Sequence, residues 1–368
     1  MSSQWGNRIK ISIFGESHGA AIGVVMDGLP AGIAIDWDEV RAQMARRAPG
    51  KSLWATARQE GDAFDVVSGY YDGHTTGTPL CAMIRNKDHQ SDSYRPFRRT
   101  PRPGHADYPA MLRYGGYQDH RGGGHFSGRL TAPLVLAGAI ARQMVASRGV
   151  TIGAHMASIG DVVDQKLGDD VTADALHALA TKPFAVVDDN QGEAMKRAIQ
   201  QAKEDGDSLG GVITCCAVGL PAGLGSPIFD AVECSLASLL FGIPAVKGVS
   251  FGSGFDVAKM RGSEANDPWS IQDGVVKTAT NHNGGIIGGI TTGMPLVVNV
   301  AIKPTPSIAM KQQTVDLDGM ASSEVEIKGR HDPCIVPRAI PVVEAAVALA
   351  VLDAWMDQSD WSERHESR

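Results

Sequence analysis

The sequence predicts an α/β fold built around two similar sheets. Apolar runs typical of strands alternate along the chain with helical patterns. The pentapeptide Gly-Leu-Pro-Ala-Gly occurs at residues 28–32 and 219–223, each time after an apolar strand and before a helix. Glycine makes up 43 of the 368 residues, above the usual ~7%, which indicates many tight turns. We interpret the pentapeptides as a duplicated strand–turn–helix unit. Chance recurrence is the competing explanation, and superposition of the two halves is the test.

The first half of the chain has a helix with a clear start and end. Asp36 is placed to act as its N-cap, Glu39 is the capping-box partner, and the helix runs to Arg47. A second helix follows a long polar segment and ends before Gly149. Strands are expected at residues 9–14, 21–26, 64–68 and 80–85, and helices at 36–47 and 132–148.

The second half is more regular and closes with an apolar helix. Ser226-Pro227 indicates a helix start, because serine suits the N-cap and proline the first helical position. From Gln358 the sequence is polar and predicts a frayed tail. We therefore expect one domain at 1–357 with an internal repeat, and a tail at 358–368. Strands are expected at residues 150–159, 212–219 and 295–302, and helices at 172–180, 190–205, 226–241 and 337–357.

Composition narrows the class of protein. A net charge of −7 disfavours a general nucleic-acid binder. Five cysteines without C-x-x-C spacing predict reduced thiols in a cytoplasmic protein rather than disulfides or a zinc site. The N-terminus has no apolar segment typical of a signal peptide. No run reaches the ~18 apolar residues of a membrane span. The nearest, 339–356, is interrupted by Pro341, Glu344 and Asp353.

A basic, glycine-rich segment at residues 95–131 stands out from the rest of the chain. Between Arg85 and Arg129 there are nine Arg or Lys residues against four Asp. Its aromatic residues argue against disorder. We interpret it as an ordered anion-binding loop with titratable histidines. A basic surface loop is the alternative.

Several common chemistries fit this sequence poorly. The histidines are scattered and no carboxylates cluster at metal-ligand spacing, so no metal site is expected. There is no G-x-S-x-G nucleophile elbow and no Rossmann fingerprint. What remains is a set of arginines, loop histidines and Gly/Ser/Thr turns. These suit a phosphorylated ligand, with histidine as the proton donor. The turn Lys303-Pro304-Thr305-Pro306-Ser307 suits a phosphate or a flavin edge.

A series of motifs follows in order along the chain, over about residues 6–353. The first is Gly15-Glu16-Ser17-His18-Gly19 with Asp27-Gly28. The others are Arg46-Arg47 before Pro49-Gly50, Ser68-Gly69, Thr75-Thr76-Gly77-Thr78-Pro79, Arg102-Pro103-Gly104-His105-Ala106-Asp107-Tyr108, Arg121-Gly122-Gly123-Gly124, Ser127-Gly128-Arg129, Gly206-Asp207-Ser208, Val246-Lys247-Gly248, Gly252-Ser253-Gly254-Phe255, Lys303-Pro304-Thr305 and Gly329-Arg330-His331-Asp332-Pro333-Cys334.

These motifs, in this order, resemble those of the chorismate synthase family. The resemblance implies a fold and a reaction. The family fold is a sandwich with helices packed between two mainly antiparallel sheets, usually assembled as a homotetramer. The family converts 5-enolpyruvylshikimate-3-phosphate to chorismate and phosphate by a 1,4-elimination in aromatic amino-acid biosynthesis. It requires reduced FMN without net redox change. No added reductase domain is recognisable, so reduced FMN is expected to come from an external source.

The resemblance also assigns roles to residues. His18 would protonate the leaving phosphate, and His105 would stabilise the reduced flavin near its N1. Asp332 would assist proton transfer near flavin N5, with Ser17 and Ser127 in support. Further flavin contacts are implied at His125, Phe126, Ser127, Pro244, Ala245, Gly288, Lys303, Pro304, Thr305, Pro306, Ser307 and Arg330, and Arg47 matches an arginine linked to phosphate or NADP binding.

Two departures from the family pattern concern these contacts. Many members have Arg-Ser-Ser-Ala-Arg where this chain has residues 125–129, so His125 replaces an arginine with a titratable ring. Leu53 stands where many members have a second arginine, which does not favour NADP. Two other functions stay open: an FMN-dependent oxidoreductase on the same fold, and a flavin- or phosphate-binding protein without catalysis. The intact Ser17, His18, His105 and Asp332 argue against the latter.

Overall fold

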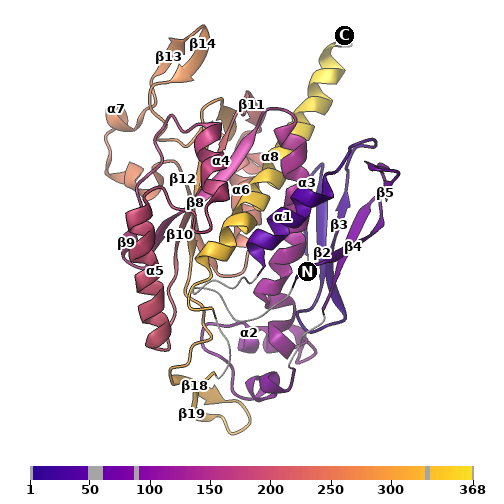
Figure 1. Ribbon diagram of the computed structural model, residues 1–368, viewed down its shortest axis with the longest axis vertical. Coiled ribbons are helices and arrows are strands. Elements are labelled where there is room, and N and C mark those ends of the chain that lie inside the picture. Colours follow the sequence, from indigo (N-terminus) through magenta and orange to yellow (C-terminus); the bar gives the residue numbers. More distant parts are fainter. Residues whose placement is uncertain (1–2, 49–60, 87–90, 328–331, 367–368) are drawn as a thin grey trace.

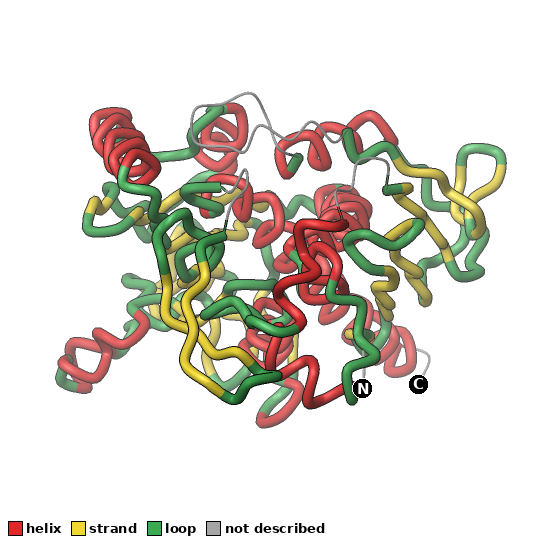
Figure 2. Tube along the Cα trace, turned by 90° about the horizontal axis from the view of Figure 1, so that it is seen from below, coloured by secondary structure: helices red, strands yellow, loops and turns green. Residues whose placement is uncertain are grey.

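Two five-stranded antiparallel sheets enclose a layer of helices (Figure 1). The computed structural model describes residues 3–48, 61–86, 91–327 and 332–366. Seen from below, strands gather at two sides of the molecule with helices between them (Figure 2). The predicted α/β sandwich is confirmed. The first sheet has the order β1 (Gln4–Trp5), β2 (Lys10–Gly15), β3 (Ala21–Asp27), β7 (Leu80–Arg85), β4 (Phe64–Ser68); the second has the order β12 (Val246–Phe251), β17 (Leu296–Ile302), β10 (Gly211–Val218), β8 (Thr151–Ile159), β9 (Val162–Val163).

Four helices form the middle layer: α1 (Trp37–Arg47), α3 (Thr131–Ala146), α6 (Val232–Phe241) and α8 (Val336–Glu366). Helix α3 packs on the first sheet and α8 on the second, and the two helices pack on each other. Gly138 makes this close approach possible. A Cβ atom added there would lie 2.2 Å from the Cβ of Ala345. A larger side chain at Gly138 would therefore force the helices, and with them the two sheets, apart.

The sheets turn one face toward these helices, as the alternating sequence predicts. Along β17 the side chains of Leu296, Val298, Val300 and Ile302 are 0–4% exposed, and the residues between them are partly exposed. Burying each such side chain contributes about 1.5–3 kcal/mol relative to leaving it in water. The period of two along the strand thus fixes which face of the sheet meets the helical layer.

Smaller elements surround the sandwich. Leu176 and Leu179 of α4 pack on the opposite face of the second sheet, next to Cys216. The hairpin of β13 and β14 projects from one end of the molecule, and that of β18 and β19 from the other (Figure 1). These peripheral elements are α4 (Ala173–Thr181), α5 (Asp189–Glu204), α7 (Gly262–Ala265), β5 (Tyr70–Tyr71), β6 (His74–Thr75), β11 (Ala222–Gly225), β13 (Trp269–Gln272), β14 (Val275–Thr278), β15 (Ile286–Ile287), β16 (Ile290–Thr292), β18 (Gln312–Asp316), β19 (Ala321–Val325) and the 3₁₀ segments η4 (Ile228–Asp230) and η5 (Gly254–Lys259).

The two pentapeptides occupy matching places. The first follows β3 and the second follows β10, each of which is the third strand of its sheet in chain order. Without the two-residue strands β1 and β9, each sheet has four strands. Numbered in chain order, these four lie side by side in the order first, second, fourth, third. Thr75 Oγ1 donates to the carbonyl of Pro30 at 2.6 Å, and Thr291 Oγ1 donates to that of Pro221 at 2.7 Å. Superposition of the halves remains the test of a duplication.

Two boundaries differ from the sequence prediction. Helix α6 begins at Val232 and not at Ser226, because Ile228 has a φ of 65° and its chain cannot continue a right-handed helix. The backbone N–H of Val232 is bound instead by the carbonyl of Gly289 at 3.0 Å. The backbone of α8 stays helical to Glu366, past Gln358, where the sequence predicts the end of the helix.

Among the described residues, one helical stretch is long and apolar enough to cross a membrane. It is Val336–Gln358 within α8, and 83% of its most apolar window is buried inside the protein. Glu344 and Asp353 lie on this stretch and are buried with partners, so α8 has the character of a core helix.

Candidate active site

The basic segment is folded, not a structureless loop. It consists of η1 (Ser91–Arg98), α2 (Asp107–Tyr114), η2 (Arg121–Phe126) and η3 (Gly128–Leu130), and it leads directly into α3. Figure 1 shows α2 beneath the helical layer, at the end of the molecule where the β18–β19 hairpin also lies. The predicted ordered loop is therefore present in the structure.

The three consecutive glycines of residues 122–124 pass between His18 and His105. Gly122 and Gly123 have φ values of 61° and 86°, a conformation that costs side-chain-bearing residues energy. A Cβ atom added to Gly122 would lie 2.5 Å from His18 Nε2. One added to Gly123 would lie 3.1 Å from His105 Nε2. The backbone thus runs against both imidazoles, and glycine is required there.

The turn that carries Ser17 and His18 is buried and held by its neighbours. Ser17 and His18 are 7% and 3% exposed. The Ser17 N–H donates to the carbonyl of Gly124 at 3.1 Å, which ties the turn to the triglycine. Asn86 Nδ2 lies 3.0 Å from the carbonyls of both Glu16 and Gly19. The His18 ring packs edge-on against Tyr94, with 5.2 Å between ring centroids.

His105 is oriented by a buried ion pair. Its Nδ1 lies 2.9 Å from Asp107 Oδ1, and Arg102 binds the same carboxylate through Nε at 2.8 Å and Nη2 at 2.7 Å. Burial alone would raise the pKa of Asp107, but hydrogen bonds from Arg102 and His105 hold it well below its usual range. Because an ionised carboxylate only accepts, the contact with Asp107 favours a proton on His105 Nδ1, whereas Nε2 lies 3.4 Å from Arg102 Nη2 and faces Gly123.

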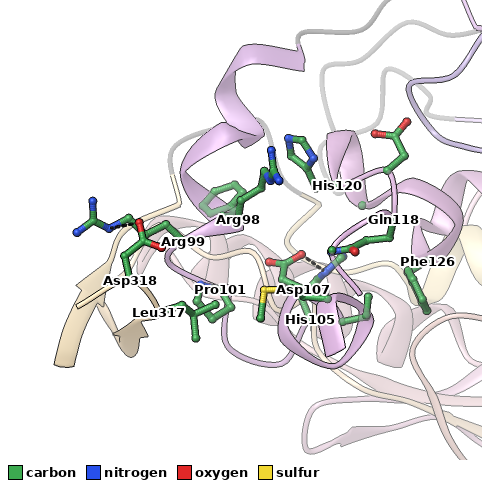
Figure 3. A pocket seen from close by; sticks show the side chains of 17 residues that line it. Arg98, Arg99, Pro101, His105, Asp107, Gln118, His120, Phe126, Leu317 and Asp318 are labelled. Atoms are coloured by element: carbon green, nitrogen blue, oxygen red, sulfur yellow. Dashed lines mark hydrogen bonds and ion pairs between the residues drawn. The ribbon is translucent and has the colours of Figure 1, made fainter. Parts of the chain in front are cut away.

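A pocket of about 400 Å³ opens beside His105 (Figure 3). Its walls come from η1, from α2, from residues 116–126 and from the β18–β19 turn. Gln118 and His120 line it, and sequence reasoning had not selected either. Gln118 Oε1 is buried without a hydrogen-bond partner in the described part of the chain. Burial, together with the nearby charge of Arg98, lowers the pKa of His120.

The Lys303–Ser307 turn lies against the loop that carries His105. Lys303 Nζ donates to the carbonyl of Gly104, and a Cβ atom on Gly104 would lie 3.1 Å from Pro306 Cβ. Burial, with a smaller effect of the charge on Lys247, lowers the pKa of Lys303. Thr305 Oγ1 is buried and has no hydrogen-bond partner among the described residues. The sequence indicates Gly104 and Lys303 as parts of two separate motifs. The structure brings these two residues into contact although they are 199 residues apart in the chain.

Pro244 and Ala245 lie next to the same turn. The N–H of Lys303 donates to the carbonyl of Ala245 at 3.0 Å, and Ala245 has a φ of 75°. Gly288 lies in the turn between β15 and β16, and a Cβ there would meet no atom within 4 Å. No contact recorded among the described residues joins Gly288 to His105.

Residues 125–127 make three different kinds of contact. His125 has both ring nitrogens hydrogen-bonded, one to Ser3 Oγ and the other to the carbonyl of Gly15, each at 2.8 Å. Phe126 lines the pocket and packs edge-on against Tyr114. Ser127 Oγ accepts from the backbone of Arg129 and caps η3. Contacts of a ligand with position 125 are therefore left to the backbone and not to the ring.

Arg47 is buried inside the fold rather than presented to a ligand. It donates to Asp62 Oδ2 at 2.9 Å, to the carbonyl of Gly128 at 3.0 Å and to Thr131 Oγ1 at 3.1 Å. Burial lowers the pKa of Arg47 to about 10. Asp332 is bound by Arg338 at 2.6 Å. Arg330 and Leu53 lie outside the described residues.

A family comparison decides what this arrangement belongs to. The family model for chorismate synthase matches residues 9–356. The chain belongs to the chorismate synthase family. Curated chorismate synthases from Dehalococcoides mccartyi and Thermococcus gammatolerans are 46% and 47% identical, over 96% and 97% of this chain and 96% and 98% of theirs. A crystal structure of chorismate synthase superposes with a TM-score of 0.76 at 27% identity, covering 96% of this chain and 93% of that one.

For a chorismate synthase family member, the unpartnered atoms and the glycines test whether a flavin fits. Gln118 Oε1 and Thr305 Oγ1 are buried polar atoms without a hydrogen-bond partner among the described residues, and a ligand or a water would supply one. Gly122 and Gly123 place backbone, not side chains, directly against both imidazoles. Gln118 Oε1 fits a polar ligand in the pocket beside His105, and Thr305 Oγ1 fits one at the Lys303–Ser307 turn.

Proposed function

We propose that this protein is a chorismate synthase, a lyase that removes phosphate from 5-enolpyruvylshikimate-3-phosphate by 1,4-elimination in aromatic amino-acid biosynthesis. The observation that carries this function is the placement of His18 and His105 against adjacent residues of one triglycine loop, in a chain of this family. Two imidazoles with separate surroundings suit two different tasks in one elimination.

His18 is proposed as the proton donor to the leaving phosphate. When the C–O bond breaks, the phosphate takes the bonding electrons, and a proton on its oxygen lowers the barrier. His18 Nε2 faces the triglycine, and Ser17 Oγ lies beside it within reach of the same Cβ position on Gly122. The ring is buried and packed on Tyr94, so it is oriented before the substrate arrives.

His105 is proposed to stabilise negative charge at the cofactor. Asp107 fixes the proton on Nδ1, and a protonated Nε2 would donate a hydrogen bond toward the ligand. Asp332 is proposed to hold a proton on the other side of the site, oriented by Arg338. Ser127 is proposed to support this network at the start of η3.

We further propose reduced FMN as the cofactor, from an external source. When bound, it supplies electron density to the substrate as phosphate leaves and takes it back with the C6 hydrogen. The chain would hold it through the backbone of residues 125–127, through Pro244-Ala245, Gly288 and Arg330, and through the Lys303–Ser307 turn. The unpartnered Thr305 Oγ1 supports the last contact. The internal bonds of Arg47 favour a role in the fold over one in NADP binding.

Self-association into a homotetramer is proposed from exposed apolar side chains. The β13–β14 hairpin carries Trp269, Ile271 and Val276, which are 57–78% exposed, and Phe255 nearby in the chain is 86% exposed. A projecting hairpin with such a surface is typical of an interface between subunits. Light scattering coupled to size exclusion measures the mass directly, and a monomer at micromolar concentration would contradict the proposal. A cytoplasmic location is proposed from the five free thiols.

One anaerobic assay separates the three functions that the sequence leaves open. The protein is incubated with 5-enolpyruvylshikimate-3-phosphate and chemically reduced FMN, and chorismate and phosphate are followed together. Chorismate synthase activity gives equal amounts of both products. Tight FMN binding without products would favour a binding protein, and oxidation of the flavin coupled to another substrate would favour an oxidoreductase.

A further inference from the structure

We infer that Asp62, a residue in no recognised motif, is a positioning residue for the reaction, and this inference rests on the proposed function. Its carboxylate holds two arginines, and through them it fixes the segments that carry Ser17, His18 and Ser127 relative to one another. The side chain of Asp62 is 1% exposed, and those of Arg47 and Arg129 are 7% and 9% exposed. The three charged groups therefore form a buried cluster behind the site.

The first arm of this cluster leads to the proton donor. Asp62 Oδ1 pairs with Arg129 Nη1, and Arg129 Nε lies 3.3 Å from Asn86 Oδ1. Because that oxygen accepts from Arg129, the amide of Asn86 is turned so that Nδ2 donates to the other side. There it binds the carbonyls of Glu16 and Gly19, each at 3.0 Å. These carbonyls flank Ser17-His18, so one amide closes the catalytic turn at both ends.

The second arm leads to the segment after the triglycine. Asp62 Oδ2 binds Arg47 Nη1 at 2.9 Å. Arg47 Nη2 donates to the carbonyl of Gly128 at 3.0 Å, directly beside Ser127. Arg338 Nε donates to the carbonyl of Arg47 at 3.1 Å, and Arg338 also binds Asp332. One carboxylate is thus connected by two or three bonds to every part of the proposed proton-handling network except the His105 loop.

The negative charge of Asp62 balances the positive charges of Arg47 and Arg129. Replacing it with asparagine leaves two buried guanidinium groups facing a neutral amide, and such groups move toward water or toward other acceptors. Movement of Arg129 releases Asn86 and with it the His18 turn. Displacement of a reacting group by about 1 Å lowers turnover on the order of 10²-fold. We therefore expect Asp62→Asn to lower kcat by about this factor while the KM for reduced FMN changes little.

Asp164 provides a matched control. Its side chain is as buried as that of Asp62, and it pairs with His155 at 2.9 Å and accepts from the backbone of Val187 and Asp188. None of its recorded partners among the described residues touches the His18 turn. Asp164→Asn should lower thermal stability, yet kcat per folded molecule should stay at the wild-type value.

The decisive experiment is a double-mutant cycle with Asp62→Asn and Asn86→Ala, measured anaerobically as kcat with saturating reduced FMN. If both residues act through one chain of contacts, the double variant loses about as much as Asp62→Asn alone. Losses that multiply, or a wild-type kcat for Asp62→Asn, would overturn the inference. If Asp62→Asn does not fold, Asn86→Ala alone decides: an unchanged kcat refutes the chain of contacts.

A readout that needs no turnover separates this inference from the proposed function. The ring nitrogens of His18 are followed by nitrogen-15 NMR, with assignment from His18→Gln. Asp62→Asn and Asn86→Ala should shift the His18 signal in the same direction, and Asp164→Asn should leave it in place. An inactive wild-type protein would remove the proposed function, whereas an unmoved His18 signal would remove the role of Asp62.

Discussion

Gly122 offers the sharpest test of the site. In Gly122→Ala the new Cβ would lie 2.5 Å from His18 Nε2 and 2.7 Å from Ser17 Oγ. The nearest ring atom is His18 Cδ2, at 2.4 Å, and ordinary contact begins at 3.4 Å, so the imidazole must retreat by about 1.0 Å. A displacement of this size costs about 10²-fold in turnover. The alanine also sits at a φ of 61°, which costs about 1–2 kcal/mol of stability.

Gly73→Ala separates these two effects. Gly73 has a φ of 81°, and a Cβ there meets no atom within 4 Å. It should therefore lose a similar stability, about 1–2 kcal/mol, with no change in kcat. Turnover is measured anaerobically with chemically reduced FMN, and stability by urea denaturation. If folded Gly122→Ala turns over as fast as Gly73→Ala, the contact between the triglycine and His18 plays no part in catalysis.

Four further predictions follow from other contacts. His105→Ala should lower turnover much more than FMN affinity; equal losses in both would argue against a catalytic role. The depressed pKa of Asp107 means that its contribution to stability is present above the unfolded pKa of about 3.9 and lost as pH falls below it. Asp107→Asn should therefore flatten the fall of the unfolding free energy measured from about pH 5 to about pH 2, a range that extends below the unfolded pKa, and an unchanged fall would contradict the ion pair. Gln118→Leu should raise the KM for FMN or substrate about tenfold if Oε1 binds the ligand; higher stability with both KM values unchanged would show that it does not. Trp269→Ser on the β13–β14 hairpin should shift the mass measured by light scattering toward smaller species. An unchanged mass would show that this hairpin faces solvent in the assembly.

Much of the fold was predictable because local patterns coincide with tertiary ones. The alternation in β17 and the capping by Asp36, whose side chain accepts from Asp38 and Glu39, both follow from short stretches of sequence. Helix α6 was misjudged because Ser226-Pro227 is a good local start signal. In the structure Ile228 has a positive φ, and the N–H of Val232 donates to the carbonyl of Gly289, which is distant in the sequence. Local propensity cannot anticipate them.

The candidate site divides in the same way. Family motifs led to Ser17, His18, His105 and the Lys303–Ser307 turn, and the structure joins the last two through Lys303 and Gly104. Asp62 could not be found from the sequence, because its importance comes from pairing with arginines 15 residues before and 67 residues after it. Gln118 was missed because an unpartnered buried atom is visible only once the surrounding packing is known.

The close contact of Gly138 with Ala345 has a consequence beyond packing. The chain leaves each sheet from the strand next to an edge, β7 beside β4 or β17 beside β12, and returns to the centre as α3 or α8. The connection before α3 carries His105, the connection before α8 carries the Lys303–Ser307 turn, and these two meet at Gly104. The site therefore lies where two halves of one chain meet. The distance between these halves depends on how closely α3 and α8 approach each other. A mutation in the apolar centre that increases the distance between α3 and α8 would separate the two halves of the site without changing any polar residue. Loss of activity in such a variant would be a mechanical effect of spacing.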